Sequence, residues 1–357
     1  MKKFFLKFFL GITILNTNAL FSEEDSFCQD CYEYRSKCRS TPCVSICCPP
    51  HCGELFIAAE YLYWKAQEDG LSYALTGLGT FGGTPPTIQG KVEDVDWKWN
   101  SGYRIGGGFV FPCQCWDLFA NYTHLNSDAK GFTEVPGTGF DSSLWTTFGP
   151  PANGSAILAP IASAQWDLRF RVVDVEAGRR FCWKNCYIFR PFGGIQVVWT
   201  KDAYDIVYSS PPDNYMQTIH QKQDFCAVGP RLGISNNWNV FRCFSFFADG
   251  AASLVWGDFK VKRLDTLGVV DPTTVVDTKH NFHSLRPLLD FKAGIMINGC
   301  FFNRVTAYAK VAYETFLVLQ HNQMLKFVDN ANLKGVFFPI NSNLVFHGLT
   351  VSAGIKF

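Results

Sequence analysis

Beyond its first residues the chain has no long uninterrupted apolar segment. None reaches the roughly 18 residues that a membrane helix requires, and the mean hydropathy is only +0.01. Charged residues make up just 18%, and 32 Lys+Arg against 31 Asp+Glu leave a net charge of +1. These deficits exclude a polytopic helical membrane protein, a disordered or coiled-coil chain, and a protein drawn to nucleic acid by its net charge.

Aromatic residues are abundant instead. They reach 16% of the 357 residues, with 34 Phe, 13 Tyr and 10 Trp, and aromatic side chains favour strands over helices. Two classes therefore remain, a water-soluble all-β protein and a transmembrane β-barrel.

The N-terminus indicates export. Residues 1–22 contain early lysines, a short apolar stretch and then small or polar residues, which is typical of a secretory signal peptide. Cleavage after Ala19 or near Ser22 would fit equally. We therefore divide the chain into a signal peptide (1–22), a Cys-rich periplasmic segment (23–53) and a β-domain (54–357).

Fourteen cysteines fit an oxidising compartment. Seven crowd into one Pro-containing segment: Cys28, Cys31, Cys38, Cys43, Cys47, Cys48 and Cys52. We interpret this segment as a disulfide-tied appendage. A zinc knuckle built on Cys28 and Cys31 is the alternative, but a second Cys-x-x-Cys at the proper spacing is missing.

From Glu54 onward apolar and polar residues alternate, which indicates strands with two different faces. Leu289, Phe291 and Ile295, for example, alternate with Asp290 and Lys292. A soluble sandwich hides the apolar face, whereas a membrane barrel turns it toward lipid. Alternation alone does not separate the two.

The lengths of strands and connections favour the barrel. Ten strands are predicted, at 54–65, 95–111, 115–128, 163–181, 186–203, 218–234, 241–261, 279–297, 302–320 and 344–357. Short connections at 112–115, 182–185, 235–240 and 298–300 alternate with long ones at 66–94, 129–162, 204–217, 262–278 and 321–343. Short turns on one rim and long loops on the other are typical of outer-membrane barrels. Twelve to sixteen strands remain the alternative, because long loops can hide further pairs.

The polar faces of these strands predict the lumen lining. The candidates are Glu60, Arg104, Asp117, Arg169, Arg171, Arg190, Arg231, Asp249, Arg286, Asp290, Lys292, Arg304, Lys310 and Glu314. Within 163–181 the charged residues change faces, so we predict a one-residue bulge near Val172–Val173.

The C-terminus decides between the two classes. Leu349, Val351, Ala353 and Ile355 alternate with small or polar residues up to the terminal Phe357. A final strand that ends on an aromatic residue resembles the signal by which barrels are passed to the outer-membrane assembly machinery. We therefore predict an all-β, up-and-down antiparallel barrel of about ten strands in the bacterial outer membrane.

Several blocks resemble the major outer membrane protein-like family of Legionella and chlamydia-related bacteria. They are 58–66 (AAEYLYWKA), 101–106 (SGYRIG), 116–124 (WDLFANYTH), 166–168 (WDL), 176–179 (EAGR) and 190–194 (RPFGG). The resemblance implies porin, envelope-structural and sometimes adhesive roles. It brings no catalytic residues and no cofactor, and the Cys-rich segment has no match in it.

The remaining cysteines near the short turns are Cys113, Cys115, Cys182, Cys186, Cys243 and Cys300. We expect disulfides there to the appendage, to another copy or to other Cys-rich envelope proteins. Local bridges such as Cys182–Cys186, or free thiols, are the alternative. Histidines show no catalytic spacing, so we expect neither an enzyme nor a metal site. The predicted function is passive solute passage or a disulfide-linked structural role, and an adhesin acting through loops 129–162 and 321–343 is the alternative. Ten strands favour a narrow or blocked lumen.

Overall fold

The computed structural model describes residues 53–79, 88–112, 115–135, 144–148, 158–183, 187–210, 215–240, 243–301, 305–327 and 336–357. The predicted signal peptide, the seven clustered cysteines, Cys113, Cys186 and Arg304 lie outside these ranges. No helix in the described ranges is long and apolar enough to cross a membrane.

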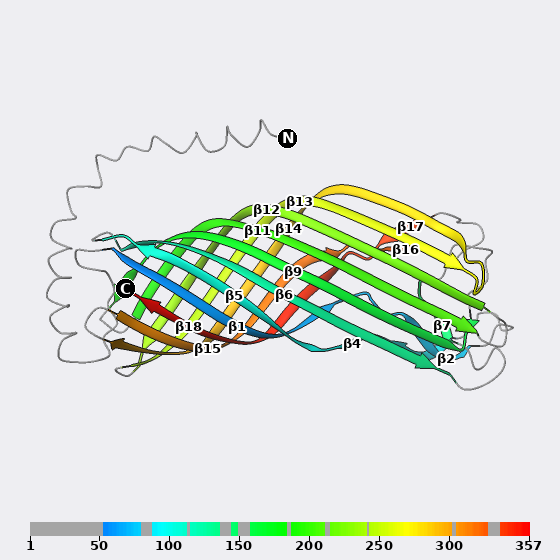
Figure 1. Cartoon of the computed structure of the whole chain (residues 1–357), viewed down its shortest axis with the longest axis horizontal. Coiled ribbons are helices and arrows are strands. Elements are labelled where there is room, and N and C mark those ends of the chain that lie inside the picture. The colour runs from blue at the N-terminus through cyan, green and yellow to red at the C-terminus, as the bar shows by residue number, and fades with distance from the viewer. Residues whose placement is uncertain are drawn as a thin grey trace, which may run out of the picture.

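Ten long strands form a closed antiparallel barrel (Figure 1). They are β1 (Glu54–Glu68), β5 (Trp99–Val110), β6 (Trp116–Glu134), β9 (Ile161–Arg179), β11 (Tyr187–Ser210), β12 (Tyr215–Asn239), β13 (Phe244–Leu267), β14 (Thr273–Phe301), β15 (Val305–Asn322) and β18 (Ser342–Lys356). Each pairs with its neighbour in the chain, and β18 pairs with β1 to close the circle. The predicted count of ten is confirmed.

The terminal residue takes part in this closure. The Phe357 amide donates to the Leu55 carbonyl and the Leu55 amide donates to the Phe357 carbonyl, both at 2.9 Å. The C-terminus therefore lies at the rim with the tight turns, at the left in Figure 1.

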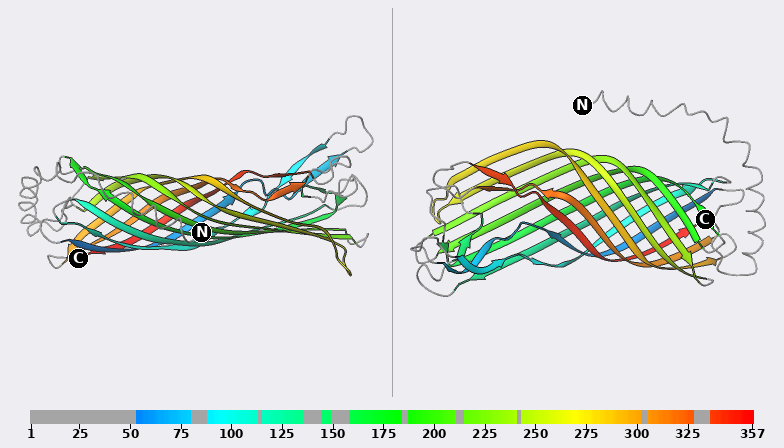
Figure 2. Two further views of the ribbon diagram at one scale, coloured as in Figure 1. Left: turned by 90° about the horizontal axis from the view of Figure 1, so that it is seen from above. Right: turned by 180° about the vertical axis from the view of Figure 1, so that it is seen from behind.

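Shorter strands gather at the opposite end (Figures 1 and 2). Strands β2 (Ala74–Gly79), β3 (Ile88–Glu93), β7 (Leu144–Thr146) and β8 (Leu158–Ala159) form a four-stranded sheet, and β16 (Leu325–Phe327) pairs with β17 (Phe337–Pro339). Strand β4 (Asp96–Trp97) extends the barrel wall beside β6, and β10 (Phe181–Trp183) does so beside β11.

Two predicted long loops are in fact mostly strand. Strands β11 and β12 pair as far as Ser210 and Tyr215, and β13 and β14 as far as Leu267 and Thr273. The segments 204–217 and 262–278 therefore extend the wall, and only 211–214 and 268–272 connect the strands. At the other rim, the predicted turns 235–240 and 298–300 belong largely to β12 and β14.

The orientation of the wall is that of a membrane protein. Phe291 is 58% exposed, Trp256 55% and Val311 41%, all on the outer surface. Asp290 and Lys310 lie inside, where they line the lumen. The apolar face of the wall therefore points toward lipid, as predicted.

Exposed aromatic residues border this apolar belt on both sides, as the aromatic girdles of outer-membrane barrels do. On the side of the long connections they are Tyr63, Trp99, Tyr103, Trp199, Trp256 and Tyr313, and near the tight turns they are Trp116, Phe181, Trp183, Trp238 and Phe246. We call these sets the outer and the inner girdle. The membrane-spanning part of the wall lies between them.

Beyond the outer girdle the two faces exchange character. On β9 the interior residues Trp166, Leu168 and Phe170 are at most 1% exposed, whereas Arg169 and Arg171 are exposed on the outside. This end of the barrel therefore resembles a water-soluble one, with an apolar interior and a polar exterior.

The predicted bulge at Val172–Val173 is wrong, because β9 pairs with β6 and β11 without any shift in register. The exchange of faces explains the pattern instead: below the girdle the same side of β9 carries Asp174 and Glu176 into the lumen. Arg169 and Arg171 were therefore wrongly assigned to the lumen.

Candidate functional site

The candidate site is the lumen, which holds a layer of charged residues between the girdles. The structure places eleven of the predicted lining residues in the interior: Glu60, Arg104, Asp117, Arg190, Arg231, Asp249, Arg286, Asp290, Lys292, Lys310 and Glu314. Sequence analysis missed Asp174, Glu176, Arg180 and Lys356, which also line it. Alternation in 163–181 could have revealed the first two, had the exchange of faces been recognised.

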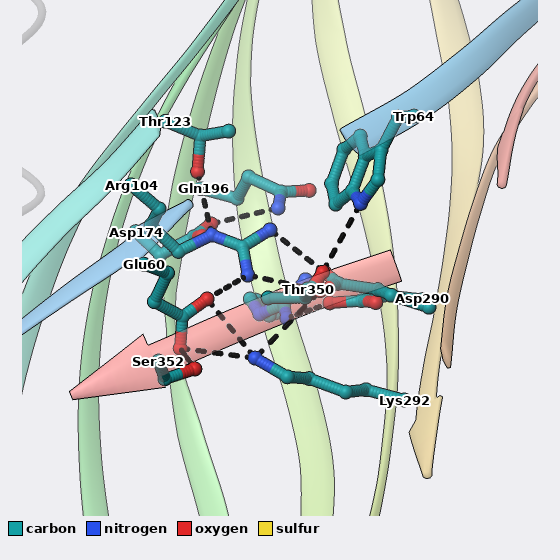
Figure 3. Close-up of polar contacts among 12 residues, drawn as sticks. Glu60, Trp64, Arg104, Thr123, Asp174, Gln196, Asp290, Lys292, Thr350 and Ser352 are labelled. Atoms are coloured by element: carbon teal, nitrogen blue, oxygen red, sulfur yellow. Dashed lines mark hydrogen bonds and ion pairs between the residues drawn. The ribbon is translucent and has the colours of Figure 1, made fainter. Parts of the chain in front are cut away.

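Arg104 on β5 is the centre of this layer (Figure 3). Its guanidinium donates to Glu60 Oε2 on β1 and to Glu314 Oε1 on β15, each at 2.7 Å, and its Nε donates to Thr123 at 2.8 Å. Because β1 and β18 separate β5 from β15 in the wall, the pair with Glu314 reaches across more than one strand.

Lys292 on β14 completes the cluster. Its Nζ lies 2.9 Å from Glu60 Oε1 and 3.7 Å from Glu314 Oε2. Ser352 and Thr350 on β18 donate to the same two carboxylates at 2.9 Å. Two cations and two carboxylates thus balance, and these contacts tie β1, β5, β14, β15 and β18 together inside the barrel. Figure 3 shows Glu60, Arg104, Lys292, Thr350 and Ser352 of this cluster.

A second cluster lies beside the first. Arg231 on β12 contacts Glu176 at 3.1 Å and Asp290 at 2.8 Å. Arg190 on β11 contacts Asp117 at 2.5 Å and Glu176 at 3.5 Å. These pairs join β6, β9, β11, β12 and β14. The lumen at this level is therefore crossed by charged side chains.

The free space that remains is small. A polar cavity of about 330 Å³ lies among these charged side chains and extends toward the rim with the tight turns, where Glu54, Asn298 and Lys356 line it. It could hold water or a small solute.

Above the charged layer the lumen is filled by aromatic side chains. The rings of Phe170 and Phe346 lie 4.3 Å apart and those of Phe225 and Phe259 4.2 Å apart, and Phe316 packs against Phe346 at 6.1 Å. All five are at most 4% exposed. These buried, mutually packed rings occupy the lumen at this level.

A buried polar group sits in this apolar layer. His321 on β15 lies between two carboxylates, with Nδ1 2.8 Å from Glu68 and Nε2 3.6 Å from Asp202. The donor atoms of the three residues lie within 4.8 Å of one another, which is close enough to hold a metal ion. The two carboxylates face opposite nitrogens of one ring, however, and Thr200 Oγ1 lies 2.8 Å from Nε2, so the ring bridges the two carboxylates through polar contacts.

Burial, followed by the nearby Glu68 charge, holds the pKa of the Asp202 carboxyl well above its usual range. Asp202 lies beyond the outer girdle, on the part of β11 that follows Trp199. Its Oδ1 has no hydrogen-bond donor among the described residues, which also favours the protonated, neutral form.

The described parts of the connections at the far end fold into the mouth of the barrel. The fully buried Arg263 on β13 donates to the carbonyls of Phe148 and Leu325 at 2.7 Å and forms a bidentate pair with Asp265. Tyr204 and Tyr208 on β11 donate to the carbonyls of Leu71 and Tyr73 at 2.5 Å. We call the residues 71–73, 147–148 and 323–325 the plug.

Disulfides form at the opposite rim. Cys115, Cys182 and Cys243 are disulfide-bonded. Cys226 is free and exposed on the outer wall.

Comparison with known proteins agrees with this architecture. The family model for the Legionella pneumophila major outer membrane protein precursor matches residues 48–357. The chain belongs to this family. It is thus an outer-membrane β-barrel protein, and the family predicted from the sequence blocks is confirmed. No curated protein matches the chain.

Solved barrels resemble this family member only remotely. The outer membrane protease OmpT of Escherichia coli is 11% identical, covers 85% of this chain and 96% of its own, and gives a TM-score of 0.42. The toluene transporter TodX of Pseudomonas putida is 8% identical, with 85% and 88% covered and a TM-score of 0.29. The attachment invasion protein Ail of Yersinia pestis is 10% identical, with 85% and 99% covered and a TM-score of 0.24.

Proposed function

We propose that this protein is a structural component of the outer membrane whose lumen is closed in its resting state. The proposal rests on one observation: the charged layer, the aromatic layer and the plug follow one another along the lumen as three barriers. A solute would have to displace all three.

The three disulfide-bonded cysteines at the rim, Cys115, Cys182 and Cys243, support the structural role. They lie on the side of the C-terminus, which is periplasmic in barrels with short turns on that rim. The Cys-rich N-terminal segment directly precedes β1 in the chain, and we propose that its cysteines link the barrel to other copies or to other Cys-rich envelope proteins. The partners we propose are therefore the surrounding lipid, the assembly machinery that receives the terminal strand, and disulfide-linked neighbours. No catalysis and no cofactor are assigned.

Passive passage of small solutes is the second candidate. The cavity of about 330 Å³ favours solute passage, because both positively and negatively charged residues line it. A solute could pass only if the plug left the mouth. The porin hypothesis therefore predicts a gated channel rather than a permanently open one.

Conductance separates the two. The full-length protein, folded and reconstituted into planar bilayers, is expected to give no steady current at neutral pH. Steady currents that scale with salt concentration in the unmodified protein would overturn the closed-barrel proposal in favour of a porin. Non-reducing electrophoresis of isolated envelopes tests the structural role: disulfide-linked oligomers are expected, and a purely monomeric band would contradict it.

A further inference from the structure

The outer wall carries a concentration of cations just beyond the outer girdle. We define the cationic patch as Arg169, Lys201, Lys222, Lys260, Lys262 and Lys279, which come from β9, β11, β12, β13 and β14. All six are exposed on the outside of the barrel, and Arg171 flanks them. Five of the six line a hollow of about 740 Å³ on the wall.

The strand register brings like charges together. Lys222 lies directly opposite Lys262, and Lys262 directly opposite Lys279. Like charges in directly opposed positions repel one another and destabilise a sheet. Three lysines in one row across three strands therefore indicate an anionic partner.

The neighbouring acids do not neutralise this row. None of the six cations forms an ion pair within the described part of the chain. Asp128, Asp205 and Asp258 pair with Lys98, His220 and His283 instead.

Two acids do lie inside the patch. Asp224 is opposite both Lys201 and Lys260, and Asp167 accepts a hydrogen bond from Gln165. The hollow is also lined by Asp128, which pairs with Lys98, and by the buried Asp202. The six cations still outnumber the acids on the outer surface.

The height of the patch identifies the partner. Lys201 follows the girdle residue Trp199 by two positions, and Lys260 and Lys262 follow Trp256 by four and six. Lys222 and Lys279 lie in register with Lys262. Aromatic girdles lie at the level of the lipid headgroups. The patch also faces sideways from the wall, toward neighbouring lipid. We propose that it binds the phosphorylated headgroups of lipids in the outer leaflet of the outer membrane.

A sulfated or acidic polysaccharide at the cell surface is the competing ligand. The position of the patch next to the apolar belt favours lipid as the ligand. A soluble polysaccharide would first contact the long connections at the end of the barrel.

The test uses the full-length folded protein in neutral detergent, titrated with lipid A and followed by native mass spectrometry. The triple variant K222Q/K262Q/K279Q removes the lysine row, and K91Q/K98Q/K130Q removes three exposed lysines elsewhere. Since each lysine near an anionic surface contributes several-fold to affinity, the first variant is expected to bind lipid A about a hundredfold more weakly. The second is expected to bind like the unmodified protein.

Folding of both variants is checked by their heat-modifiable mobility in electrophoresis, and removing like-charge repulsion should leave it intact. Equal weakening in the two variants would overturn the proposal. So would equal binding of dephosphorylated lipid A, displacement by inorganic phosphate alone, or tighter binding of a sulfated polysaccharide than of lipid A.

Discussion

Replacing Arg104 by methionine should destabilise the barrel strongly, since it removes the centre of the charged layer at nearly constant side-chain volume. The only cation near Glu314, whose side chain is 1% exposed, would then be Lys292 at 3.7 Å, and Glu60 would keep Lys292 at 2.9 Å. Two buried carboxylates would then share one cation.

Breaking a buried ion pair by removing one partner costs about 3–5 kcal/mol. The lower end applies here, because Lys292, Ser352 and Thr350 continue to contact the carboxylates. We therefore expect a loss of about 3 kcal/mol, which lowers the folding equilibrium constant somewhat more than a hundredfold.

Urea unfolding of the barrel in lipid vesicles measures this loss. Arg104→Lys is the matched control: it keeps the charge but lacks the fork that reaches both carboxylates, so its loss should fall clearly below that of Arg104→Met. A change of less than about 0.5 kcal/mol for Arg104→Met, the size of an ordinary surface substitution, would refute the assigned role of the charged layer.

Three further outcomes are expected. The Asp202 carboxyl, with its raised pKa, keeps its proton in the folded state at pH values where the unfolded state has lost it. Its contribution to the free energy of unfolding should therefore fall as pH rises above about 4, by up to about 1.4 kcal/mol per pH unit. In urea titrations at several pH values, Asp202→Asn should remove this contribution and make the decline with pH shallower than in the unmodified protein. Arg263→Ala should release the carbonyls of Phe148 and Leu325 and produce intermittent bilayer currents that the unmodified protein lacks; silence in both would show that the plug is not held by Arg263. Phe291→Lys, on the lipid face, should cost about 2–4 kcal/mol in vesicles, and the same stability as the unmodified protein would contradict the assigned orientation.

The ten strands could be predicted because period-two alternation persists along the whole wall. The same pattern misled where the faces exchange. Arg169 and Arg171 alternate with apolar residues as lumen cations would, but above the girdle water lies outside and close-packed rings lie inside. Sequence alternation gives the period of a strand and does not tell which side faces lipid, water or protein.

The closure of the lumen was only partly predictable. Ten strands indicated a narrow lumen, and its charged lining could be read from the polar faces. The plug could not, because its hydrogen bonds join Arg263 to residues 62 and 115 positions away and leave no local pattern. The disulfide pairings are equally invisible in the spacing of the cysteines.

Spin-label accessibility along β12, β13 and β14 tests the exchange of faces, on which the closed lumen and the cationic patch both depend. Nitroxides would be placed singly at Phe291, Lys260 and Phe225 in the protein reconstituted into vesicles. The account predicts that the label at 291 is reached by oxygen from the lipid, that the label at 260 is reached by a water-soluble nickel complex, and that the label at 225 is reached by neither. A label at 225 open to the nickel complex, or one at 260 reached chiefly by oxygen, would contradict it.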